Sequence, residues 1–529
     1  MTVAERAERA ERAEMAVPAP PLKKDDRRVK NDDRQVKNDD RRVRLVVPRM
    51  RIRDSTDVLS MALTAIKNAL KLPRGFSPEV EAEASAAAVA SQLPDLDQTD
   101  IEFVTIDPEG STDLDQALQF ERAGEGYIVR YAIADVPAFV LPGGLVDTEA
   151  RERGQTLYAP DGRIPLHPVV ISEAAASLLE GQVRGAFVWT MQLDAEANVT
   201  STDLRRARVR SRHRYSYVQV QQQLDTGTAN ESLQLLKEVG LKRIELERVR
   251  GGASLNRPDE EVVHKNGTYS LVLRSELPVE GWNAQVSLMT GMAAAKIMLG
   301  GGVGILRTMP DPWPDTLERF RRHVAALGMP WPTSQPYGEY LRSLDHNSPK
   351  GLAAIHAAVS LFRGAGYTAF DGTPPANDVQ AAVAAPYAHA TAPLRRLVDR
   401  FVLVTCEALV AGTPVPQWVR DALPTLPGIM ARSDGVASRL EHSSVDAIGA
   451  ALLAHRIGQA FEAVVIAVSP AQQGGAAANG ALGGGSGGVI QLMDPAVVAP
   501  IHGVVVAGQS LQATLVTADI ATGTVLFRA

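Results

Sequence analysis

The pattern of hydrophobic and polar positions changes several times along the chain. Between residues 57 and 93 apolar residues recur at helical spacing, first in VLSMALTAIKNALKL and then in PEVEAEASAAAVASQL, which a Ser-Pro pair precedes. Two helices are predicted there. Beyond residue 100 the pattern becomes strand-like: IEFVTID enters a polar loop, and LQFER and YIVRYAIADV follow. This part of the chain predicts a small sheet with an acidic loop at its edge.

The body of the chain mixes helical patterns with fewer strand-like ones. Helices are predicted at 230–250, 284–299, 314–327, 351–364, 393–411 and 434–460, and further strands at 186–193 and 269–274. Helices and strands in such an irregular order are typical of an α+β fold. We predict one large α+β domain over 96–457, preceded by a helical segment over 51–95.

The C-terminal part is strand-rich. The segments AFEAVVIAV, GGVIQLMD, GVVVAG, SLQATLVTAD and TGTVLFRA are short, apolar and separated by Gly, Pro and Asp. This pattern predicts a small OB-like β-barrel over 458–529. The stretch AQQGGAAANGALGGGSGG is predicted to be a flexible insertion, too rich in glycine to pack. Phe461 and Phe527 are the only aromatic rings of this part.

Residues 1–50 are of low complexity and contain a seven-residue repeat between Asp25 and Leu45. One apolar residue per repeat cannot form a coiled-coil seam, which needs two. A disordered, solvated tail of mixed charge is one interpretation. Because basic residues outnumber acidic ones between Lys23 and Arg44, an arm that binds RNA is the other.

Composition and charge exclude several classes of protein. Hydrophobic residues make up 45% and charged residues 22% of the 529, as in ordinary folded proteins. Cys406 is the only cysteine, which excludes a disulfide framework and a Cys-rich zinc site and favours the cytoplasm. The N-terminus lacks a signal-peptide pattern, and no stretch of roughly 18 apolar residues predicts a membrane span. A net charge of −6 still allows a local basic channel.

The acidic loop DPEGSTDLDQ is the first candidate for chemistry. Asp107, Asp113 and Asp115 converge if the turn at Gly110 folds the loop back. Carboxylates packed together repel one another, so such a cluster normally holds a cation. Oxygen ligands without His or Cys favour Mg²⁺, Mn²⁺ or Ca²⁺. The alternative is an ordinary surface loop in which Asp side chains cap backbone N–H groups. The spacing fits neither an EF-hand nor a DxDxT phosphatase.

A second candidate is PYAHATAPLRRLVDRF. Its Thr-Ala-Pro turn is predicted to open a helix whose first turn carries Arg395 and Arg396. A helix N-terminus with guanidinium groups suits a phosphate. The alternative places both arginines on a solvated helix face. Together with a carboxylate loop elsewhere, the pair favours phosphate chemistry.

Five motifs, in order, resemble the RNB catalytic domain of the ribonuclease II and R family over about 100–450. They are TIDPEGSTDLDQA, YIVRYAIADV, GQTLYAPDGRIPLHP, RYSYVQV and YAHATAPLRRLVDR. The resemblance implies a Mg²⁺-dependent (or Mn²⁺-dependent) exoribonuclease that degrades single-stranded RNA from its 3′ end to nucleoside 5′-monophosphates. No membrane association is expected, because the sequence contains no apolar span, and no protein partner is indicated.

The resemblance also implies roles for individual residues. Asp107, Asp113 and Asp115 are expected to bind Mg²⁺ and organise the attacking water, with Asp115 as the catalytic carboxylate. Tyr158 and Tyr217 match positions whose rings stack on bases near the 3′ end.

Further roles follow for four other residues. Arg395 matches an arginine that contacts the scissile phosphate. His389, Arg396 and Glu441 are the remaining RNA-binding candidates, and Glu441 is the weakest match.

The chain also departs from the family pattern. Gln116 stands where the family commonly has a fourth carboxylate, and as a metal ligand it would offer a neutral oxygen without a charge. Ser287 and Leu288 stand where the family usually has an acidic pair. The segment 1–95 shows no cold-shock barrels, which predicts a short form of the family.

Two alternative functions stay open. One is an RNA-binding protein built on an RNB fold with weakened or lost catalysis, which Gln116 suggests. The other is a metal-dependent phosphodiesterase that acts on DNA or on small nucleotides.

Overall fold

The structure is a computed structural model, and it describes residues 50–53, 57–253, 255, 259–265, 267–274, 276–346, 348–469 and 485–529. The predicted charged tail and most of the predicted glycine-rich insertion lie outside these residues. No helix in the described ranges is long and apolar enough to cross a membrane.

The first sheet is a closed barrel with the strand order β2-β3-β4-β7-β8. Its strands are β2 (Phe103–Asp107), β3 (Gln116–Ala123), β4 (Gly126–Ala134), β7 (Val183–Leu193) and β8 (Val199–Ser216). The long strand β8 pairs antiparallel with β7 up to Arg210 and then parallel with β2 from Ser211, with a register shift inside the second pairing. This double pairing closes the barrel and sets Asp107 beside Ser216 at one end.

Side chains of the barrel strands alternate between two apolar clusters. Tyr131, Phe187 and Trp189 belong to one cluster, and their strand neighbours Ala132 and Val188 belong to the other. Strands buried on both faces read as nearly continuous apolar runs, which is why YIVRYAIADV shows little polar alternation. The apolar packing on both faces holds the barrel end rigidly in place.

The larger apolar cluster includes residues of the long body helices α6 (Glu231–Arg250), α7 (Pro278–Gly301) and α11 (Leu397–Val410). Cys406 on α11 is buried, as expected for a core thiol. On α7, Gly291 permits a close crossing, because a Cβ there would lie 2.2 Å from the Tyr387 ring. The Ala388 N–H donates to the Gly291 carbonyl at 3.1 Å across this contact.

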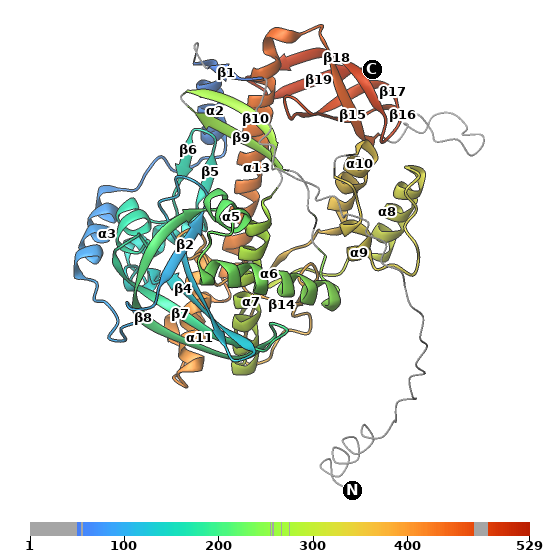
Figure 1. The fold of residues 1–529 in the computed structure, drawn as a ribbon. Helices are drawn as coiled ribbons and strands as arrows, with labels where there is room; N and C mark the ends of the chain where they lie inside the picture. The colour runs from blue at the N-terminus through green and yellow to red at the C-terminus, as the bar shows by residue number, and fades with distance from the viewer. Residues whose placement is uncertain are drawn as a thin grey trace, which may run out of the picture. The chain divides into compact units, whose positions relative to one another are not determined.

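The other helices and strands are shorter or peripheral (Figure 1). The helices are α2 (Val58–Ala69), α3 (Pro78–Ala90), α4 (Leu145–Arg153), α5 (Tyr217–Thr226), α8 (Pro314–Ala326), α9 (Tyr337–Arg342), α10 (Pro349–Ala358), α12 (Gln417–Ala422) and α13 (Leu426–Leu453). The strands are β1 (Ile52–Arg53), β5 (Leu157–Ala159), β6 (Gly162–Ile164), β9 (Asp259–Lys265), β10 (Thr268–Arg274), β11 (Val303–Thr308), β12 (Gly366–Asp371), β13 (Val379–Gln380) and β14 (Ala385–Pro386).

The C-terminal strands form a second closed barrel, in the order β15-β16-β17-β19-β18. They are β15 (Ala460–Val468), β16 (Gly485–Leu492), β17 (Val498–Val505), β18 (Ser510–Asp519) and β19 (Thr524–Arg528). Phe461 and Phe527 are buried in its core, with ring centroids 5.9 Å apart. The last turns of α13 share this apolar cluster (Figure 1).

The predicted fold is confirmed: an α+β body is followed by a small closed barrel. The two predicted helices before residue 95 are α2 and α3, and α3 begins after Ser77, whose hydroxyl accepts from the Val80 N–H at 3.3 Å. The predicted helix 434–460 is misplaced, because α13 begins at Leu426 and ends at Leu453.

The prediction that the whole glycine-rich stretch cannot pack is wrong at its end. Gly485, Gly487 and Gly488 pair with β17 in β16. A Cβ at Gly488 would lie 2.4 Å from the Ala467 carbonyl oxygen, so glycine is what lets the strands approach there.

Candidate functional site

The acidic loop between β2 and β3 lies at the end of the first barrel. Leu114, fully buried, anchors it in the apolar cluster. The Ser177 hydroxyl accepts from the Leu114 N–H at 2.9 Å and donates to the Thr112 carbonyl at 2.8 Å. The loop is therefore held from within the fold, unlike an ordinary solvated surface loop.

Asp115 is 4% exposed and directly precedes β3. Its Oδ1 accepts from the Leu394 N–H at 2.7 Å, and its Oδ2 lies 3.6 Å from Nε of Arg395. Burial raises the pKa of Asp115 well above its ordinary value, while Arg395 and the Leu394 hydrogen bond oppose that rise. Leu394 lies 279 residues after Asp115 in the sequence, so a distant segment of the chain completes the acidic loop.

Asp107 ends β2, where the acidic loop begins, and its carboxyl group, like that of Asp115, is influenced by Arg395 and Asp113. Burial raises its pKa to about 7, and repulsion from Asp113 adds to the rise, whereas Arg395 and Arg214 oppose it. Its buried Oδ2 has no hydrogen-bond partner in the described part of the chain. A buried, unpaired carboxylate oxygen is costly, and a bound cation would remove that cost.

Asp113 already has a cationic partner within the protein. Nη1 of Arg163 lies 2.7 Å from its Oδ1. The same guanidinium pairs with Glu173 and donates to the Thr112 hydroxyl at 2.7 Å. Asp113 is therefore compensated without an added ion.

The predicted metal set can be compared with this geometry. Among the described residues, no three His, Cys, Asp or Glu side chains are grouped so that they could hold a metal. Asp113 faces Arg163, and Asp115 faces Leu394 and Arg395. The unpaired oxygen of Asp107 and the all-oxygen donor set still fit a hard divalent cation.

The side chain of Gln116, the first residue of β3, is engaged at both ends. Its amide nitrogen donates to the Thr391 carbonyl at 2.7 Å. Its carbonyl oxygen accepts from the Tyr131 hydroxyl, which is also 2.9 Å from the Ser287 hydroxyl. The oxygen carried as a doubtful ligand is thus already hydrogen-bonded.

The second candidate segment folds differently from its prediction. Arg395 and Arg396 were expected in the first turn of a helix, but α11 begins at Leu397 and Arg396 has an extended backbone. The reason is a competing turn, in which Asp399 Oδ1 accepts from the Thr391 and Ala392 N–H groups at 2.8 Å.

The two arginines of this turn point to different partners. Nε of Arg396 lies 2.9 Å from Oδ2 of Asp399, so that guanidinium is used inside the fold. The Arg395 side chain remains 43% exposed beside Asp115. Only Arg395 is placed to meet a phosphate at the carboxylates.

Of the remaining predicted site residues, the two tyrosines lie near the acidic loop, whereas His389 and Glu441 make no described contact with it. The Tyr158 hydroxyl lies 3.4 Å from Asp113, and the ring is 55% exposed. Tyr217, the first residue of α5, accepts from Asn283 at 3.2 Å, and burial with the nearby Asp107 raises its pKa to about 12. Both rings adjoin the acidic loop, and the stacking role of each stays a prediction.

His389 and Glu441 are not brought to the carboxylates by any described contact. Nδ1 of His389 lies 2.7 Å from the Tyr367 hydroxyl, and burial lowers the pKa of the imidazole well below its ordinary value. Glu441 is exposed on α13 and makes no described hydrogen bond or ion pair with the loop.

Some residues of this site were missed in the sequence. Arg163 lies within GQTLYAPDGRIPLHP and Arg214 is the first residue of RYSYVQV, but a lone basic residue in a strand carries no signal of an acidic partner. Tyr131 lies in the strand pattern YIVRYAIADV and Asp399 in the predicted helix 393–411, and neither pattern indicates a hydrogen-bond partner. Only the tertiary fold shows their hydrogen bonds.

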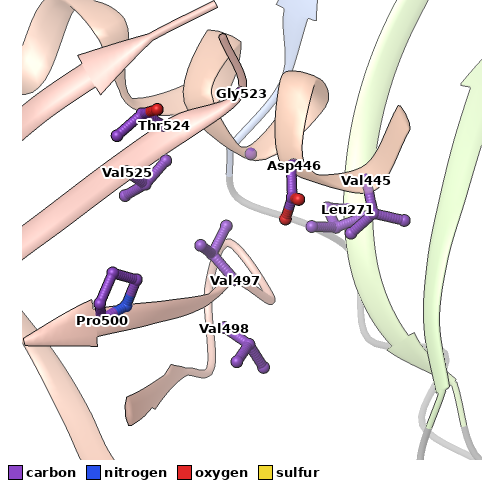
Figure 2. Close-up of a pocket in the computed structure, with 10 residues that line it drawn as sticks. Leu271, Val445, Asp446, Val497, Val498, Pro500, Gly523, Thr524 and Val525 are labelled. Atoms are coloured by element: carbon purple, nitrogen blue, oxygen red, sulfur yellow. The ribbon is translucent and has the colours of Figure 1, made fainter. Parts of the chain in front are cut away.

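A cavity of about 190 Å³ lies away from these residues, between α13, β10 and the second barrel (Figure 2). Its lining is mostly apolar, and the carboxyl group of Asp446 is its acidic group (Figure 2). Burial raises the pKa of Asp446. None of the predicted site residues lines it.

The chain was compared with known protein families. The RNB domain matches residues 95–412, which is more than half of the chain. The chain belongs to the RNB family. The RNase II-type exonuclease C-terminal S1 domain matches residues 459–529, the strands of the second barrel.

Curated relatives of this RNB protein are longer than it is. Ribonuclease R of Thermotoga maritima is 26% identical over 428 residues, which are 76% of this chain and 59% of the relative. Exoribonuclease 2 of Vibrio vulnificus is 37% identical over 107 residues, which are 20% of this chain and 16% of the relative. The RNB protein thus spans less than two thirds of the length of these relatives.

Solved structures share the fold. RNase R of Mycoplasma genitalium, in complex with ribose-methylated single-stranded RNA, matches with a TM-score of 0.77 at 18% identity, over 89% of this chain and 78% of that one. Yeast Ssd1, described as a pseudonuclease, matches with a TM-score of 0.67 at 16% identity, over 84% and 56%. At these identities the likeness concerns the fold alone.

Proposed function

We propose that this RNB protein is a divalent-cation-dependent exoribonuclease that removes nucleotides from the 3′ end of single-stranded RNA and releases nucleoside 5′-monophosphates. The observation that carries the proposal is the meeting of Asp107 and Asp115 with Arg395 at one end of the first barrel. Buried carboxylates beside an exposed guanidinium are suited to phosphoryl chemistry. The family membership and the named relatives support it.

Mg²⁺ is the cation we propose, held by Asp107 and Asp115. When bound there it would polarise the phosphodiester and lower the pKa of a water molecule. Asp107 supplies the unpaired oxygen, and its pKa of about 7 means that it ionises near neutrality. Arg163 holds the carboxylate of Asp113 in place.

Other side chains bind and orient the RNA in this proposal. Arg395 neutralises charge that develops on the scissile phosphate. The exposed Tyr158 ring stacks on a base near the 3′ end, which selects single strands without selecting a sequence. The M. genitalium RNase R, whose structures contain single-stranded or double-stranded RNA, supports RNA as the substrate.

The test uses a 5′-labelled single-stranded RNA and the same RNA with a hairpin at its 3′ end, each with the full-length protein and Mg²⁺ or EDTA. We expect ladder-like shortening of the single strand in Mg²⁺, none in EDTA, and a stop before the hairpin. Release of free nucleosides or cleavage from the 5′ end would contradict the proposal.

A second function is an RNA-binding protein with lost catalysis. It is favoured by the engagement of Gln116 and by the lack of a three-acid group in the described ranges. The pseudonuclease Ssd1 has the same fold. This function predicts that the labelled RNA shifts in a gel but keeps its length in Mg²⁺. Shortening of DNA or of dinucleotides alone would point to another phosphodiesterase.

A further inference from the structure

Two positions that depart from the family pattern meet at one hydroxyl group. Gln116 begins β3 and Ser287 lies on α7, far apart in sequence. The hydroxyl of Tyr131, on β4, donates to the Gln116 carbonyl oxygen and lies 2.9 Å from the Ser287 hydroxyl. Tyr131 is fully buried, so these hydrogen bonds are shielded from water.

The other end of Gln116 reaches the turn that carries Arg395. Its amide donates to the Thr391 carbonyl at 2.7 Å. The preceding residue, Asp115, accepts from the Leu394 N–H at 2.7 Å. Two consecutive side chains therefore hold opposite poles of one turn, one by accepting from an N–H and the other by donating to a carbonyl.

The need to donate one hydrogen bond and accept another explains why residue 116 is an amide rather than a carboxylate. An amide offers a donor and an acceptor, whereas an ionised carboxylate offers only acceptors. A carboxylate here would leave the Thr391 carbonyl without its donor and set negative charge against it. Asp399 cannot replace the contact, because it accepts from N–H groups of the turn.

We propose that Gln116, fixed by Tyr131 and Ser287, is a positioning residue that clamps the Thr391–Arg396 turn and so aims Arg395 at the phosphate beside Asp115. A neutral glutamine is thus the residue that this position requires, and Ser287 contributes to the same hydrogen-bonded arrangement. The kinetic part of the inference rests on the proposed exoribonuclease function, whereas the clamp itself does not.

Tyr131→Phe tests the clamp with little change in volume. We expect kcat for RNA shortening to fall about 10-fold, because a small displacement of a positioned group lowers the rate steeply. KM should stay within about twofold, since the RNA-stacking rings are untouched. The matched control is Tyr127→Phe, on the same strand, whose hydroxyl bonds Glu238 and Lys242 instead and whose loss should leave kcat unchanged.

Hydrogen–deuterium exchange of the full-length protein measures the clamp without relying on activity. Peptides that contain Thr391–Arg396 should exchange faster in Tyr131→Phe than in the wild type or in Tyr127→Phe. Unchanged exchange in this segment would overturn the inference even if the enzyme is active. Faster exchange in a protein that never shortens RNA would sustain the clamp and remove the proposed function.

Gln116→Asp restores the family carboxylate and gives the sharpest outcome. We expect it to lower kcat, to speed exchange in the same peptides, and to leave the affinity for Mn²⁺, measured by calorimetry, unchanged. Faster cleavage together with tighter Mn²⁺ binding would show that residue 116 is a ligand position, and the inference would fall.

Discussion

The part of the chain that the structure describes contains two closed five-stranded barrels, which differ in the residues that lie at their ends. In the first, the β2–β3 loop brings buried carboxylates against Arg395 from a distant segment. In the second, the turn after β18 places Asp519 where its carboxylate accepts from the Ala521 N–H at 2.9 Å, an ordinary capping contact. A closed barrel thus only positions the residues at its end. A reactive site arises where burial and a guanidinium from a distant segment also change the pKa of a carboxyl group.

The interiors differ as well. The first barrel is apolar on both faces and packs against helices, whereas the second holds Phe461 and Phe527 inside and so offers neither ring to a ligand. Aromatic contact with RNA, in our proposal, belongs to Tyr158 beside the first barrel. Substitutions at matched positions of the two barrels test this difference.

The largest expected effect comes from Asp115→Asn. The asparagine still accepts from the Leu394 N–H but loses the negative charge beside Arg395, so cleavage should fall on the order of 10³-fold or more while RNA binding is largely kept. A labelled-RNA assay and a gel shift measure the two. Asp519→Asn in the second barrel is the matched control and should change neither. Substantial turnover by purified Asp115→Asn would refute the assignment.

Phe527→Ala should be next in size. Phe527 is fully buried, and removing its ring should cost about 3–5 kcal/mol of the free energy of unfolding. All tryptophans lie outside 459–529, so tryptophan fluorescence reports on the rest of the chain while circular dichroism reports on both parts. We expect an early dichroism transition with unchanged fluorescence.

The control for this variant is Val516→Ala, an exposed position of the same barrel, which should shift neither signal. If both signals of Phe527→Ala moved together, the two barrels would unfold as one cooperative unit.

Tyr158→Ala should have a moderate effect. Loss of one stacked base costs about 1–3 kcal/mol, which corresponds to about 5-fold to 150-fold in Kd for single-stranded RNA. Trp313→Ala removes another exposed ring, 74% exposed, on the segment before α8, and should leave Kd unchanged. Fluorescence anisotropy in EDTA gives both values. Equal losses in the two variants would argue against a specific stacking position.

The smallest effect is a pH dependence set by Asp107. Its pKa in the folded protein, about 7, lies above its ordinary value of 3.8, so the folded state is stabilised at low pH and loses that contribution as pH rises from about 4 through 7. Cation binding requires the ionised form. Mg²⁺ should therefore raise the melting temperature more at about pH 8 than at about pH 5.5. Asp107→Asn should remove the difference, and an equal rise at both pH values in the wild type would contradict it.

Sequence patterns predicted what depends on neighbours along the chain. The strand IEFVTID, the helices of the body and the barrel strands follow from local periodicity, and the acidic loop was recognised from its composition. The start of α11 was wrong, because Asp399 and Gly154 capture N–H groups of the turn and of Leu397. The partners of Asp113 and Gln116 could not be predicted either, since Arg163 and Tyr131 meet them only through the tertiary fold.

Gly291 has a consequence for how the chain can vary. A single methyl group there would overlap the Tyr387 ring and the Ala388 carbonyl, pushing outward the segment that runs directly into the Thr391 turn. Position 291 therefore accepts only glycine. In a mutational scan of α7, Gly291→Ala should abolish activity, although its effect on the candidate site is indirect.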